Sequence, residues 1–475
     1  MSQIQTIFKN FSWLMISQII TSICAFVWTI LIGRYLGVSN YGIMNFAISL
    51  TGIAGITMDL GISTHIVRHI ATDFDSSTKY LGNAIPLKSI FSISTFILIL
   101  IVLILMKCDE LTIQITLLFT IEQIFKSITG LFNGSLQAVE EGKYQAIGNI
   151  ILNIILLIFI LLTITFDFGL YGITLSYVLA NFCVVITQYI AVKKRLSKPK
   201  WELDIEFCKK ITIASIPFAL TSLFSLILSS IDMVMLTNMV SSYANGIYSA
   251  AYKITSVFVT FYGVYSAVVF PVMSRFYKNE KNLLVISFQK SVKYLMLIFI
   301  PLSFAIMIYS QDIVVLFFGK EFLAASSALS ILMWTVSITI LCGICANLLN
   351  ASHKEKYVTL LLMISAIFNT LLNLIIIPKY SYNGAALTTI ATDLLGTSLF
   401  LYLSYRLNAV NKKLIVDLIK IFIASIILYI SLIFLNLNMW IALPVGIIIY
   451  FAIVILIKTF DDDDKYIIKE IIGKN

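Results

Sequence analysis

Long apolar runs dominate this sequence and restrict it to one class of fold. Fourteen segments of about 20 mostly apolar residues follow one another. Each is long enough to cross a hydrocarbon layer of about 30 Å as an α-helix rising about 1.5 Å per residue. The runs are continuous and lack the alternation that is typical of a membrane β-barrel. The chain is therefore predicted to be an all-α polytopic membrane protein with about 14 transmembrane helices.

The composition agrees with this class, since 59% of the residues are apolar and only 12% are Asp, Glu, Lys or Arg. Soluble domains carry about a quarter charged residues. The predicted spans are 11–32, 41–62, 81–106, 111–137, 144–166, 169–191, 211–237, 245–270, 291–310, 324–349, 357–377, 383–405, 414–435 and 439–457. The stretches between them are too short to fold as separate domains with their own cores.

The basic residues indicate how the chain is oriented. An even number of spans places both termini on one side of the membrane. The odd-numbered loops hold four of the 33 basic residues (Arg34, Lys107, Lys320 and Lys379), and most of the others lie at the termini and in the even-numbered loops. Because loops rich in Lys and Arg stay in the cytoplasm, both termini are predicted to be cytoplasmic. The net charge of +9 thus indicates orientation, and no nucleic-acid partner is expected.

Three features that suggest other chemistry have simpler interpretations. Cys342 and Cys345 form a C-x-x-C pair inside an apolar run, and are interpreted as small core residues. His65 and His69 share a helix face without further ligands beside them, as expected of an interfacial helix, so no metal is predicted. The sequence has no Gly-rich ATP-binding loop, and no cofactor is expected. The segment 461–465 (Asp-Asp-Asp-Asp-Lys) is interpreted as a solvated acidic tail.

A weak internal repeat suggests how the spans are grouped. Gly-Ile-x-x-x-Ala begins at Gly42 and again at Gly246, and pairs of Asn at i, i+4 precede both Gly172 and Gly384. The sequence separation between the two copies of each element matches spans 1–6 to spans 7–12. Two halves in the same orientation are related by an axis along the membrane normal and are typical of transporters that work by alternating access. The expected domains are an N-lobe (1–195), a cytoplasmic linker (196–210), a C-lobe (211–406), and spans 13 and 14 with a cytoplasmic tail (407–475).

Charged side chains inside the predicted spans are the candidate site residues. Each costs at least about 2.5 kcal/mol at mid-bilayer, so it normally faces a partner or a wet cavity. Glu122 and Lys126 are spaced i, i+4 in the order that favours an ion pair. Asp232 and Lys253 lie at similar depths and could pair across neighbouring helices. Asp393 lies in the middle of span 12 without an obvious partner.

Two interpretations of these charges remain open. In the structural one, Lys88 and Arg34 extend their ammonium and guanidinium groups to the interface and the pairs only hold helices together. In the functional one, cations bind an anionic substrate and carboxylates titrate or bind a coupling ion. The candidate substrate-binding residues are then Arg34, Lys126, Lys253 and Lys88. The candidate ion-coupling residues are Asp232, Asp393, Glu122 and Asp59.

Several motifs in order resemble one known family. They are Gly33-Arg34-Tyr35-Leu36-Gly37, Tyr41-Gly42, Asp59-Leu60-Gly61, 246–254 (GIYSAAYKI), 316–322 (LFFGKEF) and Asn383-Gly384-Ala385-Ala386. Together they resemble the polysaccharide transporter family, which includes the O-antigen and capsule flippases of the multidrug, oligosaccharidyl-lipid and polysaccharide exporter superfamily. The resemblance implies a two-lobed bundle of twelve helices, here with two helices appended.

The resemblance also implies a function. Such a protein carries an undecaprenyl-pyrophosphate-linked oligosaccharide to the outer leaflet of a bacterial inner membrane, driven by an ion gradient, for O-antigen, lipopolysaccharide or capsule synthesis. Its implied partners are this lipid-linked sugar, membrane lipids and other membrane proteins of polysaccharide assembly. One alternative is a cation-coupled multidrug exporter, which the intramembrane carboxylates permit. A second is a membrane enzyme of polysaccharide synthesis, which the short outer loops disfavour.

Overall fold

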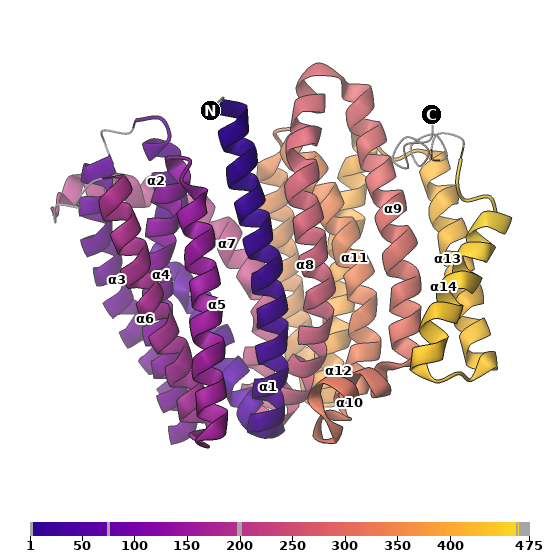
Figure 1. The fold of residues 1–475 in the computed structure, drawn as a ribbon, viewed down its shortest axis with the longest axis horizontal. Coiled ribbons are helices and arrows are strands. Elements are labelled where there is room, and N and C mark those ends of the chain that lie inside the picture. The colour runs from indigo at the N-terminus through magenta and orange to yellow at the C-terminus, as the bar shows by residue number, and fades with distance from the viewer. Residues whose placement is uncertain (1–2, 74–76, 197–201, 462–463, 465–475) are drawn as a thin grey trace. The chain divides into compact units, whose positions relative to one another are not determined.

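The computed structural model describes residues 3–73, 77–196, 202–461 and 464, and these form helices joined by short turns (Figure 1). No strand occurs in these ranges. The long helices are α1 (Gln3–Asp59), α3 (Ser77–Leu105), α4 (Glu110–Ala138), α5 (Gly142–Thr165), α6 (Gly169–Arg195), α7 (Ile205–Met239), α8 (Ser242–Asn279), α9 (Lys281–Ile308), α11 (Ala325–Ala351), α12 (Glu355–Arg406), α13 (Lys412–Leu435) and α14 (Met439–Leu456). The short ones are α2 (Ile62–Ile70), α10 (Ser310–Phe318) and the 3-10 turn η1 (Lys320–Phe322).

Twelve of the described helices are long and apolar enough to cross a membrane. Two of them, α1 and α12, each contain two of the predicted spans. α1 is interrupted at Gly37 (φ 69°, ψ 175°) and α12 at Ser381 (φ 53°, ψ −137°). Glycine adopts a positive φ readily, whereas serine there is strained. Each of α1 and α12 is therefore a pair of spans joined at a non-helical residue, so the fourteen predicted spans correspond to twelve described helices. The prediction of an all-α polytopic membrane protein is confirmed.

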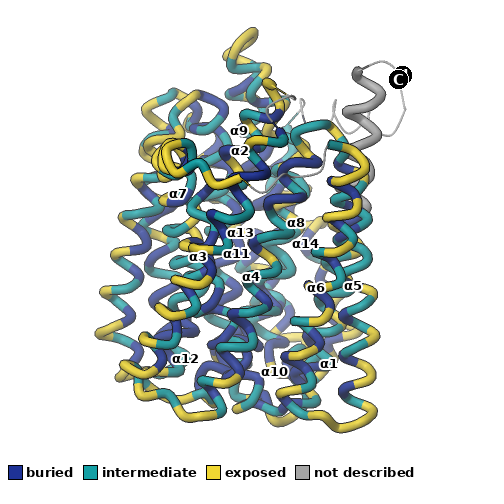
Figure 2. Tube along the Cα trace, turned by 90° about the vertical axis from the view of Figure 1, so that its left-hand side faces the viewer, coloured by how far each residue is buried: buried dark blue, intermediate teal, exposed yellow. Residues whose placement is uncertain are grey.

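Large apolar side chains remain exposed along the outer faces of these helices. On α3, Ile93, Ile97 and Ile104 are all more than half exposed. Figure 2 shows exposed positions recurring along the length of α3 and at the ends of many helices, with buried positions between them. In a bilayer such side chains contact lipid, which is as apolar as they are. The pattern fits helices surrounded by hydrocarbon.

The chain forms two compact units. Unit 1 contains residues 1–249 and 370–385, and unit 2 contains residues 250–369 and 386–475. In unit 1, α4 and α5 both pack against α6, and α1 packs against α4, α5 and α7. In unit 2, α9 packs against both α11 and α13, and α14 packs against α13 (Figure 1). The predicted division into two six-span lobes, a linker and a C-terminal pair stays a prediction.

The two glycines of the predicted repeat contact each other's helices inside unit 1. A Cβ atom added to Gly42 would lie 1.8 Å from the carbonyl oxygen of Ser242, and one added to Gly246 would lie 2.0 Å from that of Val38. The amide of Asn245 donates a hydrogen bond to the Gly42 carbonyl at 2.8 Å. No side chain fits in either place. The repeated Gly-Ile motif therefore has a structural cause, the close approach of α1 and α8.

The short helix α2 follows α1 directly and carries the two histidines. The rings of His65 and His69 lie 4.4 Å apart, and His69 stacks on Tyr80 at 5.4 Å. The described part of the chain holds no group of three His, Cys, Asp or Glu side chains that could bind a metal. The histidines thus belong to an aromatic cluster on the helix predicted for this segment.

Candidate functional site

Lys88 and Asp59 form an ion pair in unit 1. The side chain of Lys88 is 1% exposed, and its Nζ lies 2.5 Å from Asp59 Oδ1. The same ammonium donates to Ser63 Oγ at 3.0 Å and to the carbonyl oxygen of Ser127 at 2.6 Å. An ammonium group has three N–H donors, and these three acceptors use them all. The expectation that Lys88 extends to the interface is wrong, because its charge is neutralised inside the bundle.

A tight turn holds the carboxylate of Asp59 in this place. α1 ends at Asp59, and the next two residues, Leu60 (φ 45°) and Gly61 (φ 76°), adopt left-handed conformations before α2 begins. Asp59 Oδ1 accepts from the hydroxyl of Ser63 at 2.5 Å and from its N–H at 3.4 Å. A carboxylate in this position compensates unpaired N–H groups at the start of α2. A Cβ at Gly61 would lie 2.6 Å from the Ser215 carbonyl, so this Asp-Leu-Gly sequence also allows α7 to approach.

Glu122 and Lys126 form the predicted ion pair on α4. Their atoms Oε1 and Nζ lie 2.8 Å apart, which confirms the pairing expected from the i, i+4 spacing. Glu122 is 2% exposed and also accepts from the amide of Asn181 on α6 at 2.9 Å. Lys126 is 44% exposed. The pair therefore combines a buried carboxylate with an ammonium group that a ligand can reach.

Asp232 is a buried carboxylate held by neutral donors. The hydroxyl of Tyr248 donates to its Oδ2 at 2.7 Å, and the amide of Asn373 donates to its Oδ1 at 2.5 Å. All three residues belong to unit 1. Lys253 belongs to unit 2, so its predicted pairing with Asp232 stays a prediction.

The remaining candidates are Asp393, Arg34 and Lys253. Asp393 in unit 2 accepts a hydrogen bond from the hydroxyl of Thr339 at 2.8 Å, so it has a partner that its sequence position did not indicate. Arg34 is exposed on α1, three residues before the interruption at Gly37, and Lys253 on α8 is partly buried. In unit 1 the structure thus brings Lys88 together with Asp59, and Glu122 with Lys126.

Residues 7–277, more than half of the chain, match the family described as polysaccharide biosynthesis protein. The chain belongs to this family. Residues 217–375 also match the family described as MatE. The resemblance predicted from the motifs is therefore confirmed at the level of the superfamily.

Relatives of this family member cover most of its length. The capsular polysaccharide biosynthesis protein CapF of Staphylococcus aureus is 25% identical over 409 residues, which cover 84% of this chain and 99% of CapF. The probable low-salt glycan biosynthesis flippase Agl15 of Haloferax volcanii is 25% identical over 382 residues, which cover 77% of this chain and 76% of Agl15. Among solved structures, the lipid II flippase MurJ in an inward closed conformation aligns with a TM-score of 0.76 at 20% identity, covering 94% of this chain and 98% of MurJ. That match shows a shared fold.

In this member of the polysaccharide biosynthesis protein family, sequence reasoning missed the neutral partners of each charge. They are Ser63 and Ser127 for the Lys88 cluster, Asn181 for Glu122, Tyr248 and Asn373 for Asp232, and Thr339 for Asp393. Two of them carried a signal, Asn373 in the repeated Asn pair and Tyr248 in the motif 246–254. The others are ordinary polar residues of apolar helices, and only the packing of helices distant in sequence reveals their role.

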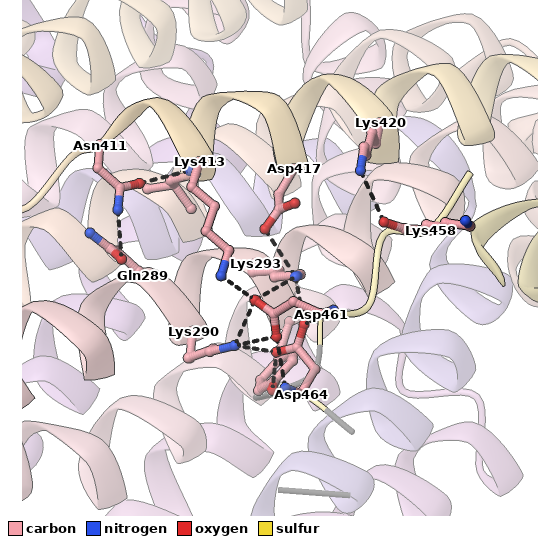
Figure 3. Close-up of polar contacts among 12 residues, drawn as sticks. Gln289, Lys290, Lys293, Asn411, Lys413, Asp417, Lys420, Lys458, Asp461 and Asp464 are labelled. Atoms are coloured by element: carbon pink, nitrogen blue, oxygen red, sulfur yellow. Dashed lines mark hydrogen bonds and ion pairs between the residues drawn. The ribbon is translucent and has the colours of Figure 1, made fainter. Parts of the chain in front are cut away.

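At Asp461 and Asp464 the predicted solvated acidic tail is wrong, because both side chains are paired and largely buried; Asp462, Asp463 and Lys465 lie outside the described residues. Asp464 is fully buried, and its Oδ2 lies 2.6 Å from Nζ of Lys293. Asp464 also pairs with Lys290, and Asp461 pairs with Lys290 at 3.1 Å and Lys413 at 2.6 Å (Figure 3). Lys293, 3% exposed, contacts Asp417 of α13 at 2.9 Å as well. The prediction failed because the lysines that bind this segment lie on α9 and α13, far away in the sequence.

These ion pairs change the titration of the tail carboxyls. Burial by itself would raise the pKa of Asp464, but the hydrogen bonds from Lys290 and Lys293 outweigh it and hold the pKa below its ordinary value. The pKa of Asp461 is likewise lowered, since the effect of burial is outweighed by the hydrogen bonds from Lys413, the Asp464 backbone and Lys290. Both carboxyls are therefore ionised near neutral pH, and the tail is held to unit 2 by charge.

Proposed function

We propose that this protein is a flippase for undecaprenyl-pyrophosphate-linked oligosaccharide repeat units, which it moves from the cytoplasmic to the outer leaflet for surface polysaccharide synthesis. The observation that carries the proposal is the match of residues 7–277 to the polysaccharide biosynthesis protein family. The names of CapF and Agl15, a capsule protein and a glycan flippase, support it. O-antigen and capsule repeat units both fit this substrate class.

The physical task of such a protein is to carry a diphosphate and several sugars across hydrocarbon. Their hydration is lost on the way, and polar groups of the protein have to replace it. Lys126, nearly half exposed beside a buried Glu122, is the best-supported cation for the diphosphate. Arg34 and Lys253 are the other candidates. Lys88 is a weaker one, because the structure commits its three donors to protein acceptors.

Coupling to an ion gradient is assigned to the intramembrane carboxylates Asp232, Asp393, Glu122 and Asp59. Asp232 and Glu122 are nearly inaccessible in their units and are held by amide or hydroxyl donors. Removing a buried carboxylate from water favours proton uptake or cation binding unless a basic group balances it. Asp232 accepts hydrogen bonds from Tyr248 and Asn373, and Glu122 is paired with Lys126.

We place the protein in the bacterial cytoplasmic membrane with both termini in the cytoplasm, on the basis of the loop charges. We also propose that an N-lobe of residues 1–195 and a C-lobe of residues 211–406, joined by a linker (196–210), alternate around the substrate, with residues 407–475 appended. Lipids and other membrane proteins of polysaccharide assembly are the proposed partners.

A multidrug exporter is the second candidate, since residues 217–375 match the MatE family. A deletion strain distinguishes the two. If the protein is a flippase, the complete lipid-linked repeat unit accumulates on the cytoplasmic face and surface polysaccharide is lost. Normal surface polysaccharide together with increased drug sensitivity would support the exporter. In the complemented strain, Lys253→Ala is expected to reduce polysaccharide export while the protein remains inserted.

A further inference from the structure

A small cavity of about 190 Å³ lies beside Asp59 in unit 1. Its walls come from the neighbouring helices α1 and α2 and from α4 and α7, which lie further along the sequence. Gly52 and Ile56 of α1, Gln123 of α4, and Ser222 and Leu226 of α7 line it with Asp59. The volume is several times the about 30 Å³ of one liquid water molecule and lies below the about 300 Å³ at which drug-sized pockets begin.

The polar groups of this cavity have unused hydrogen-bonding capacity. All three donors that reach Asp59 bind Oδ1, and no donor in the described part of the chain reaches Oδ2. In the same described residues, the carboxamide of Gln123 and the hydroxyls of Ser222 and Thr64 have no hydrogen-bond partner either. Gln123 is partly buried, and Ser222 and Thr64 are exposed, so a ligand can reach all three. Here a carboxylate, an amide and two hydroxyls are available to one ligand.

The charge of the cavity excludes the diphosphate as that ligand. Its lining contains one charged side chain, Asp59, whose negative charge is balanced by Lys88 behind it. Lys88 is 1% exposed and its three donors are occupied, so it offers nothing to an anion. An organic cation would gain little electrostatic binding free energy from the Asp59–Lys88 pair, because that pair is already neutral. The site instead suits a neutral ligand with several hydroxyl groups, which donate to the carboxylate and exchange hydrogen bonds with the amide and hydroxyls.

The walls also suit the less polar part of such a ligand. Ile56 and Leu226 present aliphatic carbon that can cover the C–H face of a ring. Gly52 keeps the space open, since a Cβ atom added there would meet nothing within 4 Å. At Gly55, by contrast, an added Cβ would lie 2.3 Å from Nε2 of Gln123, so this glycine makes room for the carboxamide. The two glycines thus serve a cavity lined by both polar and apolar groups.

We propose that this cavity binds one sugar ring of the transported oligosaccharide. This inference rests on the proposed flippase function and separates the sugar subsite from the cations that would bind the diphosphate. Lys88 is then a positioning residue that holds Asp59, and Gln123, Ser222 and Thr64 contact the sugar. The cavity recognises hydroxyl groups on a single ring.

Filling the cavity tests the proposal in the complemented deletion strain. Gly52→Leu places a side chain in the open space and is expected to lower export of surface polysaccharide at least tenfold, whereas Gly52→Ala lowers it less than threefold. Gly263→Leu is the matched control, because Gly263 is also a helical glycine with nothing within 4 Å of an added Cβ but lies on α8 in unit 2. It is expected to export normally. Wild-type export by Gly52→Leu would overturn the sugar subsite.

A binding measurement on the purified full-length protein in nanodiscs gives a direct reading. Saturation-transfer difference NMR with D-glucose, D-galactose and N-acetyl-D-glucosamine is expected to show transfer to ring protons of at least one sugar. Gly52→Leu removes this transfer and Gly263→Leu keeps it. Equal transfer in wild type and Gly52→Leu, or none to any of the three sugars, contradicts the proposal. Should Gly52→Leu not accumulate in membranes, Gln123→Ala is expected to weaken transfer about two- to tenfold, the value of one hydrogen bond.

These outcomes separate the subsite from the flippase function. A deletion strain without surface polysaccharide, rescued fully by Gly52→Leu, would leave the flippase standing and reject the sugar cavity. A deletion strain with normal surface polysaccharide would reject the flippase whatever the NMR result.

Discussion

The cytoplasmic tail offers a quantitative test of the packing in unit 2. Lys293→Met removes the ammonium that contacts Asp464, Asp417 and Asp461, at 2.6, 2.9 and 3.9 Å. Methionine has a similar length and fills the same space, so the change removes mainly charge. Asp464 is fully buried, and among the described residues its carboxylate then retains Lys290 as a basic partner. The tail is expected to detach from α9.

Breaking a buried ion pair by removing one partner costs about 3–5 kcal/mol. Because Lys290 still pairs with Asp464, we expect the lower end of this range. A loss of about 3 kcal/mol raises the detached population about a hundredfold. Lys413→Met provides the matched control within the same cluster. Lys413 is 56% exposed, and removing an exposed pair costs about 0.2–1 kcal/mol, which corresponds to about fivefold at most.

The tail sequence supplies its own assay. Residues 461–465 (Asp-Asp-Asp-Asp-Lys) form the recognition sequence of enteropeptidase, which cleaves after the lysine. The protease needs the aspartates that the lysines hold, so the cleavage rate follows the detached population when reattachment is fast. Release of residues 466–475 is measured by mass spectrometry on protein in nanodiscs. Wild-type cleavage as fast as that of a free peptide, or equal rates for Lys293→Met and Lys413→Met, would refute the reasoning.

Three further predictions concern other parts of the molecule. Lys88→Met leaves Asp59 without its ammonium partner and is expected to destabilise the protein by about 3 kcal/mol, measured as a lower Tm in detergent. The double variant Lys88→Met/Asp59→Asn is expected to recover part of the lost Tm, and a Tm no higher than that of Lys88→Met would contradict the pairing. Gly42→Ala is expected to prevent accumulation in the membrane because its Cβ meets the Ser242 carbonyl, whereas Gly52→Ala accumulates normally on a quantitative immunoblot. Because the pKa values of Asp461 and Asp464 are lowered, their ion pairs are complete above the ordinary carboxyl pKa and are lost as pH falls below it. The anisotropy of a dye on the C-terminus should therefore stay constant from pH 7 to pH 5, and a decrease in that interval would show that the pairs do not hold the tail.

The fold could be predicted to a large extent because each span carries its own signal. A run of about 20 apolar residues needs no partner elsewhere in the chain to become a membrane helix. The one-helix ion pair of Glu122 and Lys126 was predictable for the same reason, since its spacing lies within one turn. The interruptions of α1 and α12 were predictable as span boundaries, but the residues at which each helix breaks were not. Gly37 and Ser381 differ little from other residues between spans.

The candidate site depended more on tertiary structure. Asp59 belongs to a recognisable motif, yet nothing local shows that Lys88, 29 residues later, is its partner. The same holds for the tail, where Lys293 and Asp464 are 171 residues apart. The sequence predicted that Asp461 and Asp464 are solvated, because runs of acidic residues usually face water. The outcome differed because three lysines on two other helices surround them.

The sequence by itself determined that this chain is a membrane protein built of long helices, and its motifs indicated the family. Both depend on information carried within one segment, the length of an apolar run or the order of nearby residues. Only the tertiary structure decided which charges neutralise each other, which donors remain available beside Asp59, and where the acidic tail binds. A charge inside a membrane protein is stable only with a partner, and that partner is chosen by the packing of helices whose sequence separation is arbitrary.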